Sequence, residues 1–117
     1  MKHLNRKSRE KLLEKRFTFL LEFYSGLYEV LPEGVLSSLR ETRYYLPRIM
    51  LCHSMTCFKL PNGASTYSMR EISQLLNKHS STVVHYKIRS RRMLFLKEQE
   101  RSYLEKAQEA LEKASLN

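Results

Sequence analysis

The stretch "SMREISQLLNKHSSTVVH", residues 68–85, carries the signals for two helices joined by a tight turn. Ser68 is followed three residues later by Glu71, which is the capping-box pattern that starts a helix. Three aliphatic residues at helical spacing would form the buried face of this first helix: Ile72, Leu75 and Leu76. Residues 68–76 therefore predict a short helix that starts at Ser68.

A second helix is expected after a turn at Asn77. Asparagine tolerates the left-handed backbone conformation that closes many helices, so Asn77 would end the first helix. Ser80 or Ser81 can cap the second helix, because a serine hydroxyl accepts a hydrogen bond from a free N–H of the first turn. The stretch thus predicts a helix-turn-helix.

The N-terminal part of the chain predicts two further helices. Over residues 9–28 apolar side chains recur at spacings of three and four, which places them on one face of a helix: Leu13, Phe17, Leu20, Leu21, Tyr24, Leu27 and Tyr28. Pro32 and Gly34 predict a turn. Residues 35–46 then predict a short helix that stops before Pro47.

Two more helices are expected around the opening stretch. Pro47 suits the first position of a buried helix over residues 47–58, and "PNG" at residues 61–63 predicts the loop that follows it. From Ser81 the helical pattern continues for about 30 residues, with a possible break near Arg92. Its last part carries an apolar stripe that could pack on the first helix or pair between chains: Leu96, Tyr103, Leu104, Ala107, Leu111 and Ala114.

The composition favours an all-α fold. The 117-residue chain fits one domain with a single core, and its three glycines and three prolines are too few for the turns of a sandwich or barrel. We therefore expect a helical bundle of about five helices. Its parts would be an N-terminal helical extension (1–46), a helix-turn-helix core (47–92) and a C-terminal amphipathic helix (93–117).

The charge of the chain points to an anionic partner. The formal net charge is +9, and residues 48–92 hold eight Lys or Arg residues against one acid, Glu71. Nucleic acid is the leading candidate for such a partner, and a membrane surface is the second. A basic helix over residues 1–20 could lie on anionic lipid, although its aromatic face is more typical of a core.

The start of the second helix has side chains suited to DNA. Six polar residues lie at or just after its N-terminus: Lys78, His79, Ser80, Ser81, Thr82 and His85. The methyl group of Thr82 can contact the C5-methyl of thymine, and His79 or His85 can donate to a purine N7. Four basic residues that follow would add sequence-independent affinity: Lys87, Arg89, Arg91 and Arg92. The alternative is that the serines only cap a helix and the basic residues form a solvated face.

The residues "YSMREISQLLNKHSSTVVH" resemble the DNA-binding C-terminal domain of the bacterial chromosomal replication initiator DnaA. The family signature is approximately S-L-x-E-I-G-x-x-F-G-R-D-H-S-T-V-x-H-A, and the alignment needs no gap. Eight residues match or nearly match it: Ser68, Glu71, Ile72, Leu76, Ser81, Thr82, Val83 and His85. The resemblance covers about residues 40–92. It implies a bundle of that family's type, which is similar to the Trp repressor, and sequence-specific binding of double-stranded DNA in replication initiation or its regulation.

The resemblance also implies a role for individual residues. Ser80, Ser81 and Thr82 fall where the family contacts bases, and Arg48, Arg70 and Lys78 fall where it contacts the DNA backbone. Arg40 falls on the family's minor-groove arginine, with Arg43 as its near substitute. An arginine there is attracted by the negative potential of a narrow groove.

The chain departs from the family at three places. The family's Asp-His pair at the turn is His79-Ser80, which removes an acceptor for cytosine. The small Ala after the family's His is Tyr86, and a later Ile position is Ser90, with Ile88 two residues before it. We therefore expect a changed target sequence and a repacked inner face.

Several other functions are not expected. No G-x-x-x-x-G-K-[ST] motif for ATP occurs, and the four histidines show neither metal-ligand spacing nor a partner Asp, so we expect no enzyme, cofactor or metal site. Cys52 and Cys57 are expected to be buried and reduced, on different helix faces. The N-terminus lacks a signal-peptide core and no apolar run could span a membrane, which favours a cytoplasmic protein with no membrane partner.

A second function remains open beside DNA binding. The chain could be a helical protein-interaction module in which the stripe over residues 96–114 binds a partner protein or a second copy. In that case its positive charge would give only nonspecific attraction to DNA.

Overall fold

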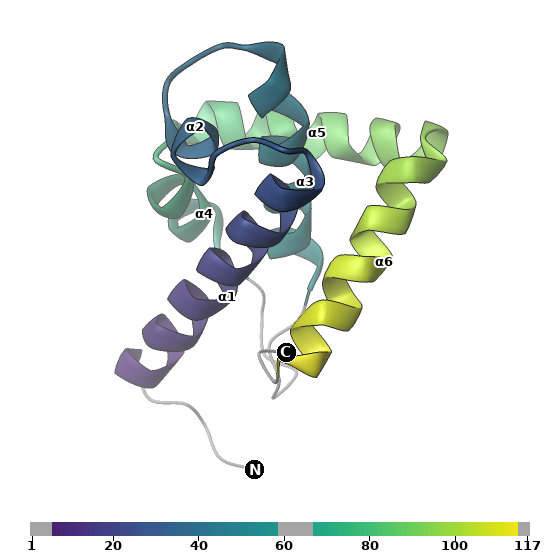
Figure 1. Cartoon of the computed structure of the whole chain (residues 1–117). Coiled ribbons are helices and arrows are strands. Elements are labelled where there is room, and N and C mark those ends of the chain that lie inside the picture. The colour runs from purple at the N-terminus through teal and green to yellow at the C-terminus, as the bar shows by residue number, and fades with distance from the viewer. Residues whose placement is uncertain (1–5, 59–66, 115–117) are drawn as a thin grey trace.

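The computed structural model describes residues 6–58 and 67–114, apart from the side chains of Arg6, Phe95 and Leu96, and the described chain is entirely helical between its turns. Figure 1 shows the arrangement. The helices are α1 (Arg6–Leu27), α2 (Pro32–Leu36), α3 (Thr42–Cys57), α4 (Met69–Leu76), α5 (Ser80–Leu96) and α6 (Glu98–Lys113). The expected all-α bundle is confirmed. Within these residues no helix is both long and apolar enough to cross a membrane.

Helix α3 is the centre of the bundle, because each of the other five helices contacts it. Its middle is apolar on nearly every side, and five of its apolar residues are at most 1% exposed: Ile49, Met50, Leu51, Cys52 and Met55. A helix that is apolar all round must be surrounded by other elements to be stable in water. The remaining helices therefore take their positions from α3.

Helices α1 and α6 pack against each other and run in roughly opposite directions (Figure 1). Ala107 and Leu111 of α6 are buried, and the ring of Tyr103 meets the ring of Tyr28 edge to face at 5.4 Å. The Tyr28 hydroxyl donates to the buried carboxylate of Glu100 at 2.9 Å. Burial and this carboxylate raise the pKa of Tyr28. Of the two expected uses of the C-terminal stripe, packing on the first helix is the one that the fold shows.

Helix α4 begins and ends as its sequence predicts. The Ser68 hydroxyl accepts from the Glu71 N–H at 3.1 Å, and the Glu71 carboxylate accepts from the Ser68 N–H at 2.8 Å, which is a complete capping box. Asn77 ends the helix in the left-handed conformation, with φ 55°. The capping residue of α5 was predicted wrongly: it is His79, whose ring nitrogen accepts from the Ser81 N–H, rather than Ser80 or Ser81.

The predicted helix over residues 35–46 is wrong. The N–H and the hydroxyl of Ser37 both donate to the Gly34 carbonyl, which closes α2 after Leu36. Helix α3 then begins at Thr42, so Pro47 lies inside it rather than at its first position. The helix tolerates Pro47 at the cost of one backbone hydrogen bond, because proline has no N–H to donate.

Two smaller expectations also need correction. The long C-terminal helix breaks at Lys97, not near Arg92, and the extended backbone of Lys97 (φ −112°, ψ 108°) lets α6 turn back along α1. Cys52 is buried as expected, whereas Cys57 is exposed.

Two glycines provide a matched test of the packing. A methyl group on Gly34 would lie 2.1 Å from the Tyr44 ring, whereas one on Gly26 would meet no atom within 4 Å. We expect Gly34→Ala to lower the free energy of unfolding by about 1–3 kcal/mol through this overlap. Gly26→Ala should raise it by about 0.5–1 kcal/mol, because alanine favours the helical backbone. Urea unfolding followed by circular dichroism measures both, and equal stability of the two variants would contradict the packing of Tyr44 on Gly34.

Candidate nucleic-acid interface

Helix α5 has one buried face and one exposed face. Its inner side chains pack against α3, α4 and α6, and they are Val83, Tyr86, Ser90, Met93 and Leu94. The opposite face lies in solvent along two to three turns, and it consists of Ser81, Val84, His85, Ile88 and Arg92. Spacings of three and four keep these five side chains on one side of the helix. The exposed face therefore presents hydroxyl, imidazole, aliphatic and guanidinium groups together.

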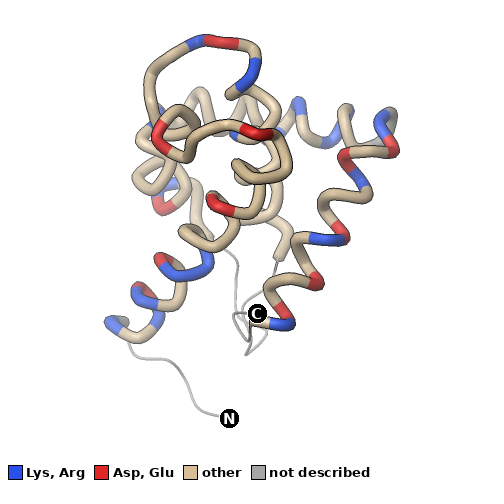
Figure 2. Tube along the Cα trace, in the orientation of Figure 1, with Lys and Arg blue, Asp and Glu red and all other residues tan. Residues whose placement is uncertain are grey.

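The charge on α5 has a single sign. Its 17 residues contain no Asp or Glu, and its cations are Lys87, Arg89, Arg91 and Arg92. Figure 2 shows the contrast with α6, where acidic and basic positions alternate. The three arginines are exposed and Lys87 is half-buried. Such a concentration of one sign gives a positive potential that attracts a polyanion.

The N-terminus of α5 is fixed by His79. Its Nδ1 lies 3.2 Å from the Ser81 amide nitrogen and 2.9 Å from the Ser81 hydroxyl, and it accepts from the amide. Because Nδ1 accepts in this contact, Nε2 is the ring nitrogen left to bond a group outside the helix. Ser80 is exposed beside this cap, and Thr82 is half-buried. The structure thus brings His79, Ser80, Ser81 and Thr82 together, as the sequence predicted.

Tyr45, near the start of α3, joins this helix to the middle of α5. Its hydroxyl lies 3.3 Å from His85 Nε2 and accepts from Arg89 Nε at 3.2 Å. Its ring also meets Tyr86 edge to face at 6.1 Å. Tyr45 was not among the site residues predicted from the sequence, where its one signal is its position two residues after Arg43. This contact fixes two of the polar groups on α5.

Arg40 and Arg43 lie just before and at the start of α3. Both side chains are exposed. Arg43 pairs with Glu41 and lies over the Tyr44 ring at 4.9 Å. Because Tyr45 holds the start of α3 against α5, these two arginines lie at the same end of the bundle as the middle of α5. Arg70 is also exposed, in the first turn of α4.

Arg48 is not available to DNA, which corrects the expectation that it contacts the backbone. The residue is 4% exposed. Its guanidinium donates to four carbonyl oxygens at 2.7–2.9 Å, those of Gly34, Val35, Ser37 and Leu39. A side chain with its donors used inside the fold has none to offer a phosphate. Arg48 is therefore a structural residue.

Lys78 is held by the same segment. Its ammonium donates to the carbonyl of Ser37, to that of Leu36 at 3.3 Å and to that of Leu76 at 3.5 Å. Burial and the neighbouring charge of Arg48 lower the pKa of Lys78. In the structure, Lys78 ties the turn between α4 and α5 to the end of α2.

A further polar contact between α3 and α5 involves His53, Cys57 and Ser90. His53 Nδ1 lies 3.1 Å from the hydroxyl of buried Ser90, and His53 Nε2 lies 3.3 Å from the sulfur of Cys57. Burial, with a smaller effect of Arg91, lowers the pKa of His53. In the described part of the chain, no three His, Cys or Glu side chains are grouped to hold a metal ion.

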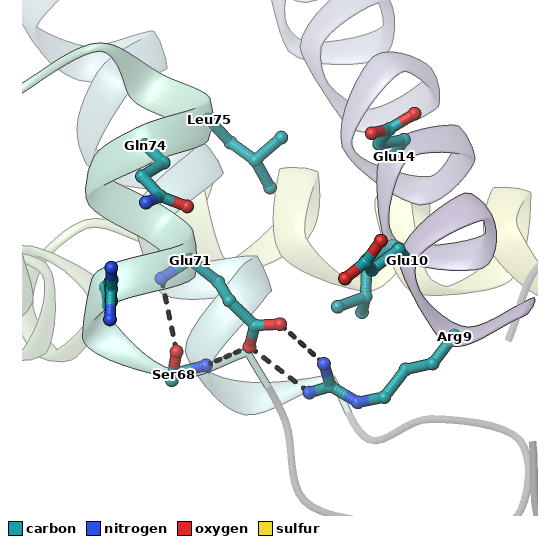
Figure 3. Close-up of a pocket in the computed structure, with 9 residues that line it drawn as sticks. Arg9, Glu10, Glu14, Ser68, Glu71, Gln74 and Leu75 are labelled. Carbon is teal, nitrogen blue, oxygen red and sulfur yellow. Dashed lines mark hydrogen bonds and ion pairs between the residues drawn. The ribbon is translucent and has the colours of Figure 1, made fainter. Parts of the chain in front are cut away.

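A pocket of about 770 Å³ lies between α1 and α4 (Figure 3). Arg9 of α1 reaches across it and makes two hydrogen bonds to the carboxylate of Glu71, which also accepts from the Ser68 N–H. The hydrogen bond from Arg9 is the main reason that the pKa of Glu71 is lowered. Glu10 and Glu14 line the same pocket. The arrangement fastens α1 to the start of α4.

The role of Arg48 can be tested by substitution. We expect Arg48→Met to lower the free energy of unfolding by more than about 2 kcal/mol, because several buried carbonyls lose a charged donor. Arg48→Lys should recover part of this loss. The matched control is Arg40→Met, an exposed change expected to stay within about 0.5 kcal/mol of the wild type. Equal urea midpoints for Arg48→Met and Arg40→Met would contradict the structural role.

The Arg9–Glu71 pair predicts a dependence of stability on pH. A carboxyl whose pKa is depressed in the folded state stabilises above its unfolded pKa, and this contribution is lost as the pH falls through the folded pKa. We expect Arg9→Met to be less stable than the wild type at pH 7. The difference should shrink in acid as the pH falls through the folded pKa of Glu71, which lies below its ordinary value. Urea midpoints measure it, with Glu14→Gln as the control, and a difference that does not change with pH would rule out this coupling.

Comparisons with known proteins give no relative that could assign this site. No protein-family model matches the chain, and neither the curated proteins nor the solved structures contain a match to it. The chemistry of the exposed face of α5 must therefore be argued from its own residues.

Proposed function

We propose that this protein binds double-stranded DNA, with α5 in the major groove and α4 across the backbone. The observation that carries the proposal is the exposed face of α5, where hydroxyl and imidazole groups precede a run of arginines and no acid is present. The major groove admits an α-helix, and its base edges present donors and acceptors for such side chains. The arginines would supply the affinity that does not depend on sequence.

The N-terminus of α5 suits a phosphate better than that of α4. Free N–H groups and the helix dipole favour an anion at the N-terminus of each of these two helices. In α4 the carboxylate of Glu71 already occupies this position, whereas the first turn of α5 contains no acid. Arg70, exposed in the first turn of α4, can contact a neighbouring phosphate.

Arg40 and Arg43 extend the proposed interface beyond α5. Both are exposed at the end of the bundle where Tyr45 contacts His85 and Arg89. From there an arginine can enter the adjacent minor groove, which is the role that the resemblance to DnaA implies for Arg40. Arg48 is left out of this interface, and Lys78 could join it only by releasing carbonyl oxygens.

The biological setting of the proposal comes from the resemblance alone. Residues 68–85 resemble the signature of the DnaA DNA-binding domain, so the finer proposal is a DNA site used in replication initiation or its regulation. The alternative function, a partner protein on the C-terminal stripe, lacks a free surface at the centre of that stripe. Ala107 and Leu111 are buried in the bundle that α6 forms with α1.

Selection of bound duplexes from a random-sequence pool, followed by affinity measurements, tests the proposal. We expect an enriched site, for which Thr82→Ala loses about 1–3 kcal/mol of binding free energy while binding to unrelated duplexes changes little. Arg92→Ala should instead weaken binding to all sequences and reduce the salt dependence by about one counterion. Lys113→Ala, an exposed change on α6, is the control. Failure to bind duplex DNA would refute the proposal, and an equal loss on every sequence for Thr82→Ala would refute base recognition by that residue.

A further inference from the structure

Two exposed aliphatic side chains on α5 lie outside the hydrophobic core. Val84 is 46% exposed and Ile88 is 54% exposed. Two other large apolar residues of the described chain are as exposed, Leu31 and Leu39, and they lie on either side of α2. Only Val84 and Ile88 stand one helical turn apart on the same helix face.

The surroundings of this aliphatic pair are polar and positive. Ser81 and His85 lie on the same exposed face before Ile88, and Arg92 lies one turn after it. A second copy of the chain docked on this face would bring two α5 helices without acidic residues together, which like-charge repulsion opposes. A helix that binds a lipid surface normally inserts a wide apolar face with large side chains, and two aliphatic residues are too few for such a face. The charge instead complements a polyanion that also presents small apolar groups.

The major groove of DNA is such a surface, because thymine exposes its C5-methyl there between phosphate-bearing strands. We propose that Val84 and Ile88 contact thymine methyl groups and make this protein prefer A·T base pairs under the middle of α5. The inference rests on the proposed function. Four helical residues advance about 6 Å, which is close to two base-pair steps. The two side chains would therefore touch methyl groups about two base pairs apart.

A contact with the C5-methyl group distinguishes thymine from uracil, which hydrogen bonding in the groove does not. Uracil pairs with adenine as thymine does and differs only by the missing methyl group. Replacing thymine by uracil therefore removes the apolar contact and leaves every hydrogen-bond donor and acceptor of the groove in place. A preference for thymine over uracil that depends on Val84 and Ile88 would identify the contact directly.

The experiment uses the full chain and two short duplexes, alternating dA-dT and alternating dA-dU, with fluorescence anisotropy at near-physiological salt. We expect the wild type to bind the thymine duplex about three- to tenfold more tightly. The variant Val84→Ala/Ile88→Ala should lose most of this preference and keep only the part that the Thr82 methyl supplies, and alanine preserves the helix. A variant that keeps the full wild-type ratio would overturn the inference. Leu31→Ala, which trims an equally exposed aliphatic residue at the start of α2, should keep the wild-type ratio.

The possible failures are distinguishable. If the wild type binds both duplexes with equal affinity, the methyl contact is wrong while DNA binding stands. If it binds neither, the proposed function fails and the inference fails with it. The last measurement is binding to vesicles of phosphatidylcholine with phosphatidylglycerol. Wild-type binding to these vesicles that the double variant loses, without any thymine preference, would assign the aliphatic pair to a lipid surface instead.

Discussion

The buried guanidinium of Arg48 is the interaction on which the rest of this structure depends. It donates to the carbonyl oxygens of Gly34, Val35, Ser37 and Leu39, and so holds the end of α2 and the segment before α3 in place. Backbone carbonyls buried without donors would destabilise the fold. Lys78 donates to the same segment, so this cluster also sets the position of the turn between α4 and α5. One cationic cluster thus orients both the start of α3 and the start of α5.

The buried charge of Arg48 also has an electrostatic effect on neighbouring groups and on α5. The hydrogen bonds of Arg48 go to neutral carbonyl oxygens, so its charge is balanced by dipoles and not by a carboxylate. Its field lowers the pKa of Lys78, and it opposes the effect of burial on the pKa of Tyr86 in α5. A positive charge in a poorly polarisable interior acts over a longer range than one in water. Arg48 can therefore add to the positive potential around α5 although its own side chain is buried and would not contact a polyanion.

The sequence predicted the parts of the fold that local chemistry decides and failed where distant residues decide. The start of α4 at Ser68 and its end at Asn77 follow from side chains within four residues of each boundary, and both were predicted correctly. Residues 35–46 have an acceptable helical composition, yet they do not form one helix, because Ser37 caps α2 and Arg48 binds the carbonyls that follow. No sequence pattern near residue 37 indicates that its carbonyl binds Arg48, which lies eleven residues further along the chain. The grouping of residues 79–82 was predictable for the same reason that α4 was, whereas the inward direction of Arg48 was not.

The exposed face of α5 shows why the candidate site could be predicted only in part. Aliphatic residues four apart, such as Val84 and Ile88, are typical of a buried stripe, and serine is usually exposed, although the resemblance to DnaA aligns Ser90 with an inner Ile. The fold reverses both, because His53 of α3 and the Lys87 carbonyl bond the Ser90 hydroxyl on the inner side, at 3.1 and 2.8 Å. Burying a hydroxyl costs little when it has such partners, whereas leaving valine and isoleucine in water gains the fold nothing. An arrangement that places the serine inside and two aliphatic residues outside, among arginines, therefore adds little to the stability of the bundle, and the proposed contact with DNA would account for it.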